Sequence, residues 1–61
     1  MIYVEMKRDG EFSLGAFWHK NKINCFEIRQ PGSSAGKIKI TRGKDGAALE
    51  SEYDRIVALA E

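Results

Sequence analysis

Two adjacent aromatic residues, Phe17 and Trp18, lead into a short segment that carries the lysines Lys20 and Lys22. Aromatic faces beside ammonium groups are the combination that stacks nucleic-acid bases and contacts a phosphate backbone. The same pattern fits an edge hairpin whose aromatic rings are buried and whose lysines maintain solubility. On this segment alone, the second interpretation is the commoner one in small sheets.

Residues that could support catalysis are isolated from one another. His19 has no nucleophile or acid beside it, so it is predicted to be an exposed turn residue. Cys25 lies within a predicted strand, where a buried small hydrophobe is the usual role. Glu50, Glu52 and Asp54 surround a predicted helix start, where capping and the helix dipole account for carboxylates. The sequence therefore predicts a protein without enzymatic activity and without a cofactor.

The chain has 61 residues and reads as a single domain, residues 1–61, close to the lower size limit for independent folding. A lone cysteine excludes an internal disulfide, and one cysteine with one histidine cannot supply a structural zinc site. By elimination, we expect a homodimer to supply additional buried area.

Charge is distributed unevenly along the sequence. Residues 1–46 carry a net charge of +4 and residues 47–61 a net charge of −3, which together give the formal net charge of +1. A basic part followed by an acidic part fits a surface for a polyanion with a solvated reverse side. A free cysteine suits a reducing compartment, and no apolar run reaches membrane-spanning length. We expect a cytoplasmic protein with no membrane partner.

Hydrophobic periodicity predicts four strands followed by one helix. The strands are separated by an Asp9-Gly10 turn, a Lys20-Asn21 turn and a polar loop over 30–36. This order predicts an α+β fold in which one helix covers one face of an antiparallel sheet. The predicted strands are Ile2–Lys7, Phe12–Trp18, Ile23–Arg29 and Lys37–Thr41.

Alternation within these segments predicts which side chains face the core. In the last strand Ile38 and Ile40 are expected to point inward and the lysines between them outward. Gly15 is a candidate bulge that would reset the register of its strand. Because of that bulge, the sequence leaves open which of Phe17 and Trp18 is exposed. The same alternation places Ile2, Val4 and Met6 on one face and makes Phe26 and Ile28 core residues.

The C-terminal segment carries a single apolar stripe at helical spacing. Ser51 with Asp54 resembles a capping box, so the helix is predicted to start at Ser51 and to end at Ala60. Residues 46–49 could form either a first helical turn or a last extended segment. The stripe consists of Leu49, Tyr53, Ile56, Val57 and Ala60.

Two stretches together resemble the transcriptional coactivator family called positive cofactor four, with its bacterial and phage relatives. These are Phe26-Glu27-Ile28-Arg29 and the run from Gly43-Lys44-Asp45-Gly46 through Leu59. Ala47 stands where the family usually has isoleucine, and Tyr53 where it has tryptophan or phenylalanine. The insertion of Trp18-His19 departs from the family's Phe-Lys-x-Lys hairpin. The resemblance implies a dimeric domain that binds single-stranded DNA without sequence specificity, with roles in transcription, replication or recombination.

Taken together, these patterns predict a dimeric protein that binds single-stranded DNA or RNA on a sheet surface, alone or with transcription or replication proteins. The predicted stacking groups are Phe17 and Trp18. The predicted phosphate contacts are Lys20, Lys22 and Arg29 at the centre, with Lys7, Lys39, Arg42 and Lys44 at the periphery. The predicted dimer contacts are Tyr53, Ile56, Val57 and Ala60.

Two other classes of function remain open from the sequence. One is a small duplex-DNA reader, similar to the sheet-plus-helix arm-binding domains of integrases, which would place a basic sheet in the major groove. The other is a phage-type inhibitor or adaptor that binds a protein through its acidic helix. Preference for duplex over single strand distinguishes the first, and charge reversal of the helix distinguishes the second.

Overall fold

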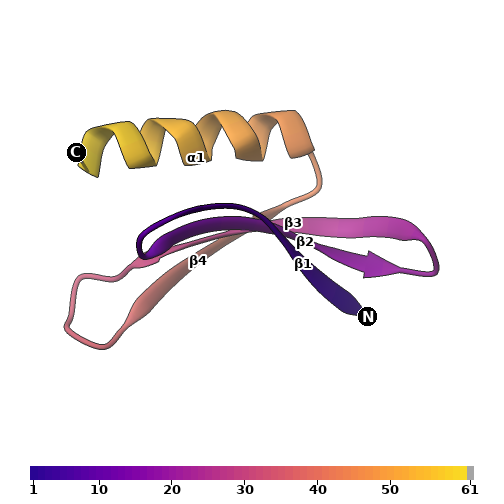
Figure 1. Cartoon of the computed structure of the whole chain (residues 1–61), viewed down its shortest axis with the longest axis horizontal. Helices are drawn as coiled ribbons and strands as arrows, with labels where there is room; N and C mark the ends of the chain where they lie inside the picture. The colour runs from indigo at the N-terminus through magenta and orange to yellow at the C-terminus, as the bar shows by residue number, and fades with distance from the viewer. Residues whose placement is uncertain (61) are drawn as a thin grey trace.

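A four-stranded antiparallel sheet with one helix on one of its faces forms the whole fold (Figure 1). The computed structural model describes residues 1–60, and the strands lie in the order β1-β2-β3-β4. The predicted α+β fold is therefore confirmed. The elements are β1 (Ile2–Asp9), β2 (Phe12–His19), β3 (Lys22–Pro31), β4 (Ile38–Gly43) and α1 (Gly46–Ala60).

Tight turns join the first three strands where the sequence predicts them. Gly10 has a φ of +61°, in the left-handed region that glycine adopts without strain. Lys20 and Asn21 have φ values of +51° and +64°. Positive φ at both central residues is typical of the two-residue hairpin turn whose twist matches that of its strands.

The sheet contains two register shifts, and the extra residue of each lies outside β2. The first shift adjoins Gly15, because Glu5 pairs with Gly15 and Lys7 pairs with Leu14. The extra residue is therefore Met6 of β1, so the bulge predicted at Gly15 in β2 lies instead on the strand opposite it. The shifts lie between Glu5 and Lys7 in β1 and opposite the Phe17–Trp18 bond in β3. β2 itself therefore keeps a regular alternation of side chains, while β1 and β3 carry the extra residues.

The core lies between the sheet and α1. Leu14, Ile28 and Tyr53 are its buried side chains, and the Tyr53 hydroxyl donates a hydrogen bond to the Phe12 carbonyl oxygen at 3.2 Å. Burial of each such side chain contributes about 1.5–3 kcal/mol to folding. The helix stripe and the two core residues predicted in β3 are confirmed, except that Ala60 is exposed. The partly buried side chains that complete the core are Phe12, Phe26, Leu49, Ile56 and Val57.

The facing of β4 is opposite to the prediction. Thr41 pairs with Ile28, which faces the helix, so Ile38 and Ile40 point to the other side of the sheet. Their exposed fractions are 64% and 45%. Alternation alone defines two sets of side chains, and the pairing with β3 decides which set is covered.

The helix begins five residues before Ser51. The Ala48 amide donates to Asp45 Oδ1 at 3.2 Å, and the Leu49 amide donates to the Asp45 carbonyl oxygen at 3.0 Å. Asp45 is therefore the N-cap, and residues 46–49 form the first helical turn. In the part of the chain that the structure describes, no helix is long and apolar enough to cross a membrane.

Candidate functional site

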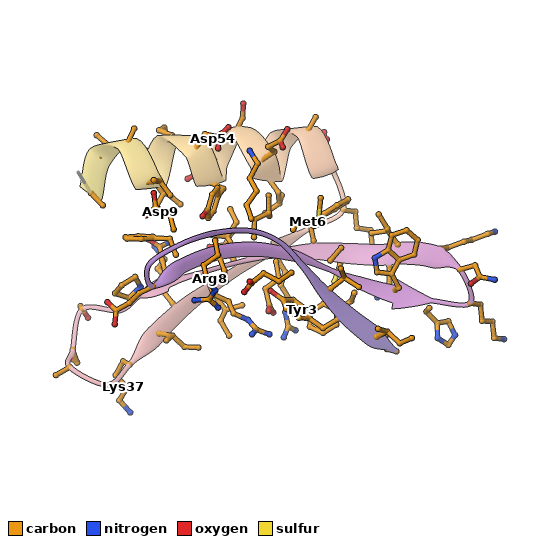
Figure 2. The ribbon with its side chains drawn as sticks, viewed as in Figure 1. Tyr3, Met6, Arg8, Asp9, Lys37 and Asp54 are labelled. Carbon is orange, nitrogen blue, oxygen red and sulfur yellow. The ribbon has the colours of Figure 1, made fainter. Side chains whose placement is uncertain are left out.

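The face of the sheet that points away from α1 is uncovered and carries most of the polar side chains of β1–β4, together with two aromatic rings. Figure 2 shows Tyr3 and Arg8 on this side, with Asp54 of the helix on the other. We call it the open face. By the pairing register, its members are Tyr3, Glu5, Arg8, Ser13, Gly15, Phe17, Cys25, Glu27, Arg29, Ile38, Ile40 and Arg42.

A buried carboxylate lies at the centre of the open face. Glu27 is fully buried, and each of its oxygens accepts a hydrogen bond from a different arginine. Arg29 Nε donates to Oε2 at 2.6 Å, and Arg42 Nε donates to Oε1 at 2.8 Å. Burial by itself would raise the pKa of Glu27, but the hydrogen bonds from Arg42 and Arg29 outweigh it and lower this pKa. Glu27 is thus a carboxylate that fixes two guanidinium groups.

Two aromatic rings flank these guanidinium groups. The ring centroids of Tyr3 and Phe17 lie 5.0 Å apart with the planes tilted by 57°. Arg29 Cζ lies 4.3 Å from the centroid of the Tyr3 ring, and Arg42 Cζ lies 5.7 Å from that of Phe17. Contacts of this kind contribute about 0.5–1 kcal/mol each at exposed sites. We call Tyr3, Phe17, Glu27, Arg29 and Arg42 the arginine–aromatic cluster.

Gly15 makes room for this arrangement. A Cβ atom on Gly15 would collide with Oη and Cζ of Tyr3, so the Tyr3 ring lies directly over the glycine backbone. The same hydroxyl is buried and has no hydrogen-bond partner within the described residues. The glycine therefore positions Tyr3 against Arg29 at the cost of one unpaired hydroxyl.

The chemistry available on the open face is recognition of anions and planar groups. Each arginine uses Nε to contact Glu27, and no Nη atom of Arg29 or Arg42 forms a hydrogen bond within residues 1–60. Guanidinium groups present paired donors that match phosphate or carboxylate oxygens. The adjacent rings supply stacking surfaces for bases.

The structure brings together only three of the residues predicted to bind nucleic acid. Phe17, Arg29 and Arg42 meet in the arginine–aromatic cluster. Trp18 pairs with Ile2 and Ile23 on the face that carries α1, so Phe17 and Trp18 cannot form one stacking platform. Both aromatic side chains are half-buried.

The remaining predicted cations are dispersed. Lys22 pairs with His19 at the hairpin end of β2 and β3, on the same face as Phe17 by strand alternation. Lys20 lies in the turn itself, and Lys44 lies in the loop between β4 and α1. These lysines are exposed or lie at the margins of the open face.

Two predicted phosphate contacts lie on the helix side of the sheet, which corrects their assignment. Lys7 Nζ lies 3.1 Å from Glu50 Oε2 and 3.2 Å from Asp54 Oδ1, and these hydrogen bonds raise the pKa of Lys7. Lys39 pairs with Gln30, one position from Arg29, and so points away from the open face. Neither lysine can join a contact made on that face.

The predicted dimer residues belong largely to the core of their own chain. Tyr53 is only 4% exposed, and Ile56 and Val57 pack half-buried against the same cluster. Tyr53 is therefore not available to a partner, which corrects its assignment. Ala60 is exposed.

Sequence reasoning missed Tyr3, Gly15 and Glu27 as parts of the site. The available signal was the alternation of β1, which places Tyr3 opposite to Ile2 and Val4, together with an acidic residue between two predicted core positions of β3. A contact between residues 3, 15 and 29 depends on the pairing of three strands, which alternation does not specify.

No family model matches the chain, and no curated protein or solved structure matches it at a significant level. The resemblance to the positive cofactor four family therefore stays a prediction.

Proposed function

We propose that the protein binds single-stranded nucleic acid, without strong sequence preference, on the open face of its sheet. The observation that carries the proposal is the arginine–aromatic cluster, in which two guanidinium groups and two aromatic rings meet on an uncovered surface. Stacking of a base on an aromatic side chain contributes about 1–3 kcal/mol, and it tolerates any base.

The order of cationic and aromatic side chains along β2 and β3 defines a path that an extended single strand of nucleic acid could follow. Lys22 lies at the hairpin end, Phe17 follows on the same face, and Arg29 lies opposite Ser13 farther along. Four residues of strand from Phe17 to Ser13 span about 13 Å, at about 3.3 Å per residue. This length accommodates two or three nucleotides of an extended single strand.

The charge arrangement on the helix weighs against the adaptor alternative. Glu50 and Asp54 pair with Lys7, and Glu52 pairs with Arg55. Because these carboxylates are already paired within the chain, the acidic helix offers little free charge to a protein partner. The duplex-reader alternative can be distinguished by comparing affinity for single-stranded and duplex DNA. The bases of a duplex stay stacked on one another, so their faces are unavailable to Tyr3 and Phe17.

The test is fluorescence anisotropy with a labelled 12-nucleotide oligothymidine and a duplex of equal length, over a salt series. We expect binding that favours the single strand and weakens as salt rises, because phosphate contacts release counterions. Phe17→Leu keeps an apolar side chain and removes the ring, so it should weaken binding about fivefold or more.

Matched lysine variants test the surface. Lys20→Ala/Lys22→Ala should reduce the slope of log affinity against log salt by about 0.7 for each lysine that pairs with a phosphate in the wild type. Lys39→Ala, on the helix side, should have no such effect. Absence of binding at low salt, preference for the duplex, or an equal change of slope in Lys39→Ala would contradict the proposal.

A further inference from the structure

We infer that Glu27 is a positioning residue: it orients Arg29 and Arg42 so that the two guanidinium groups together bind one phosphodiester. This inference rests on the proposed function and specifies the part of the ligand that the cluster takes: the non-bridging oxygens of one backbone phosphate, with the adjoining bases on the aromatic rings. Glu27 itself touches no ligand, since it is fully buried beneath the two guanidinium groups.

The hydrogen bonds of Glu27 determine which edge of each arginine is free. Both arginines donate Nε, one to each oxygen of the same carboxylate, at 2.6 and 2.8 Å. A guanidinium group that is bound through Nε leaves its two Nη atoms as donors. The side chains of Arg29 and Arg42 are 39% and 62% exposed, so these donors reach solvent.

The aromatic rings restrict the same guanidinium groups from a second direction. Tyr3 lies against Arg29, and Phe17 lies near Arg42. Gly15 holds Tyr3 in this place, because any larger residue would collide with its ring. Long side chains fixed before binding lose less conformational entropy when the ligand arrives.

The charge of the cluster matches a phosphodiester. Two guanidinium groups and one carboxylate leave a net charge of +1, and a phosphodiester carries one negative charge. The neighbouring pair of Glu5 and Arg8 is neutral and adds no net charge. One backbone phosphate therefore balances the charge of the arginine–aromatic cluster, and the rings beside it favour a nucleic acid over a carboxylate-bearing peptide.

The sign of the effect of Glu27→Gln tests this inference. Removing a negative charge would strengthen binding of an anion if Glu27 acted only through its charge. If Glu27 positions the arginines, oligothymidine binding by Glu27→Gln should weaken about tenfold, the effect of one charge-assisted hydrogen bond. Glu52→Gln is the matched control, since Glu52 pairs with Arg55 on the exposed helix surface, and its affinity should not change.

A second variant tests the inference even if Glu27→Gln does not fold. Amide NMR spectra show whether each variant is folded. Arg29→Lys/Arg42→Lys keeps every charge but removes the Nη pairs, and it should also weaken binding about tenfold. Arg55→Lys is its control. Wild-type affinity in Arg29→Lys/Arg42→Lys, or unchanged or tighter binding in folded Glu27→Gln, would overturn the inference while the proposed function stands.

Two measurements on the wild-type protein, binding to oligothymidine and competition by polyglutamate, distinguish the remaining outcomes. Failure of the wild-type protein to bind oligothymidine would overturn both the proposed function and this inference. Displacement of oligothymidine by polyglutamate at equal charge concentration would overturn the phosphodiester assignment and indicate an acidic peptide. We expect polyglutamate to compete at least tenfold less well.

Discussion

At the scale of single residues, the packing of the open face depends on Gly15, because this residue has no side chain. Gly15 is fully enclosed in the sheet, and the Tyr3 ring occupies the space where a Cβ atom would lie. The ring must move if any side chain is introduced. Tyr3 would then no longer pack against Arg29, so the effect of a change at Gly15 reaches the arginine–aromatic cluster.

Gly15→Ala should therefore destabilise the protein by about 1–3 kcal/mol, the usual cost of overpacking. Urea unfolding followed by circular dichroism measures this change in the free energy of unfolding. In a Tyr3→Ala background the same substitution should cost far less, because the colliding ring is gone. Equal costs in the two backgrounds would contradict the close approach of Tyr3 to Gly15.

Glu27 should make stability depend on pH in the acid range. Its pKa in the folded protein is lowered from the ordinary value of 4.5, because the hydrogen bonds of the two arginines outweigh the effect of burial. The unfolded chain therefore binds a proton more readily, and stability falls as pH falls. The contribution of Glu27 is complete above pH 4.5 and is lost as pH drops through the lower folded-state pKa.

Urea unfolding of the wild type and of Glu27→Gln between neutral pH and pH 3 measures this dependence. The wild type should lose more stability than the variant, which has no carboxyl group at this position. Parallel pH profiles for the two proteins would show that Glu27 is not stabilised as a carboxylate by the arginines.

At the scale of elements, the start of α1 is determined by Asp45. Its carboxylate and its carbonyl oxygen accept hydrogen bonds from the first amides of the helix. Ser51 lies within the helix and is exposed, so it has no capping role. The first turn matters for packing because Gly46 lies close against Phe26.

Asp45→Ala should cost about 1 kcal/mol of stability, the typical loss of an N-cap. Ser51→Ala should have little effect, or should stabilise slightly through the better helix propensity of alanine. Thermal unfolding of the two variants measures both effects. The reverse order of stability would place the cap at Ser51.

At the scale of the whole molecule, apolar side chains remain uncovered on the helix side of the sheet. The β2–β3 hairpin end projects past the N-terminal end of α1 (Figure 1). Ile2, Val4 and Ile23 lie on this part of the sheet and are 67%, 45% and 39% exposed. The accessible surface is 4440 Å². A compact monomer of this mass would expose about 4,000 Å².

We expect the uncovered side chains of Ile2, Val4 and Ile23 to be covered by a second copy of the chain. Sedimentation equilibrium at tens of micromolar should show a dimer, and Ile2→Ser/Ile23→Ser should shift it to a monomer. Ile38→Ser removes an equally exposed side chain from the open face and should leave the dimer intact. A wild-type monomer at every concentration would exclude this association.

Local patterns in the sequence were sufficient for the order of the elements. Gly10 and Asn21 indicate tight turns because glycine and asparagine adopt positive φ more readily than most residues, and the helical stripe around Tyr53 follows from the 3.6-residue period. These features depend on neighbours within a few residues. For this reason the strands, the turns and the covering helix could all be predicted.

The pairing of strands decided the rest. Alternation groups Ile38 with Ile40, but only the register of β4 against β3 shows that both face away from α1. Tyr3 and Arg29 are 26 positions apart, and their contact requires two strand pairings and a glycine between them. The turns and periods were thus determined by the sequence itself. The open face and its cluster were decided by tertiary structure, because contacts between distant residues depend on register and on space that no local pattern encodes.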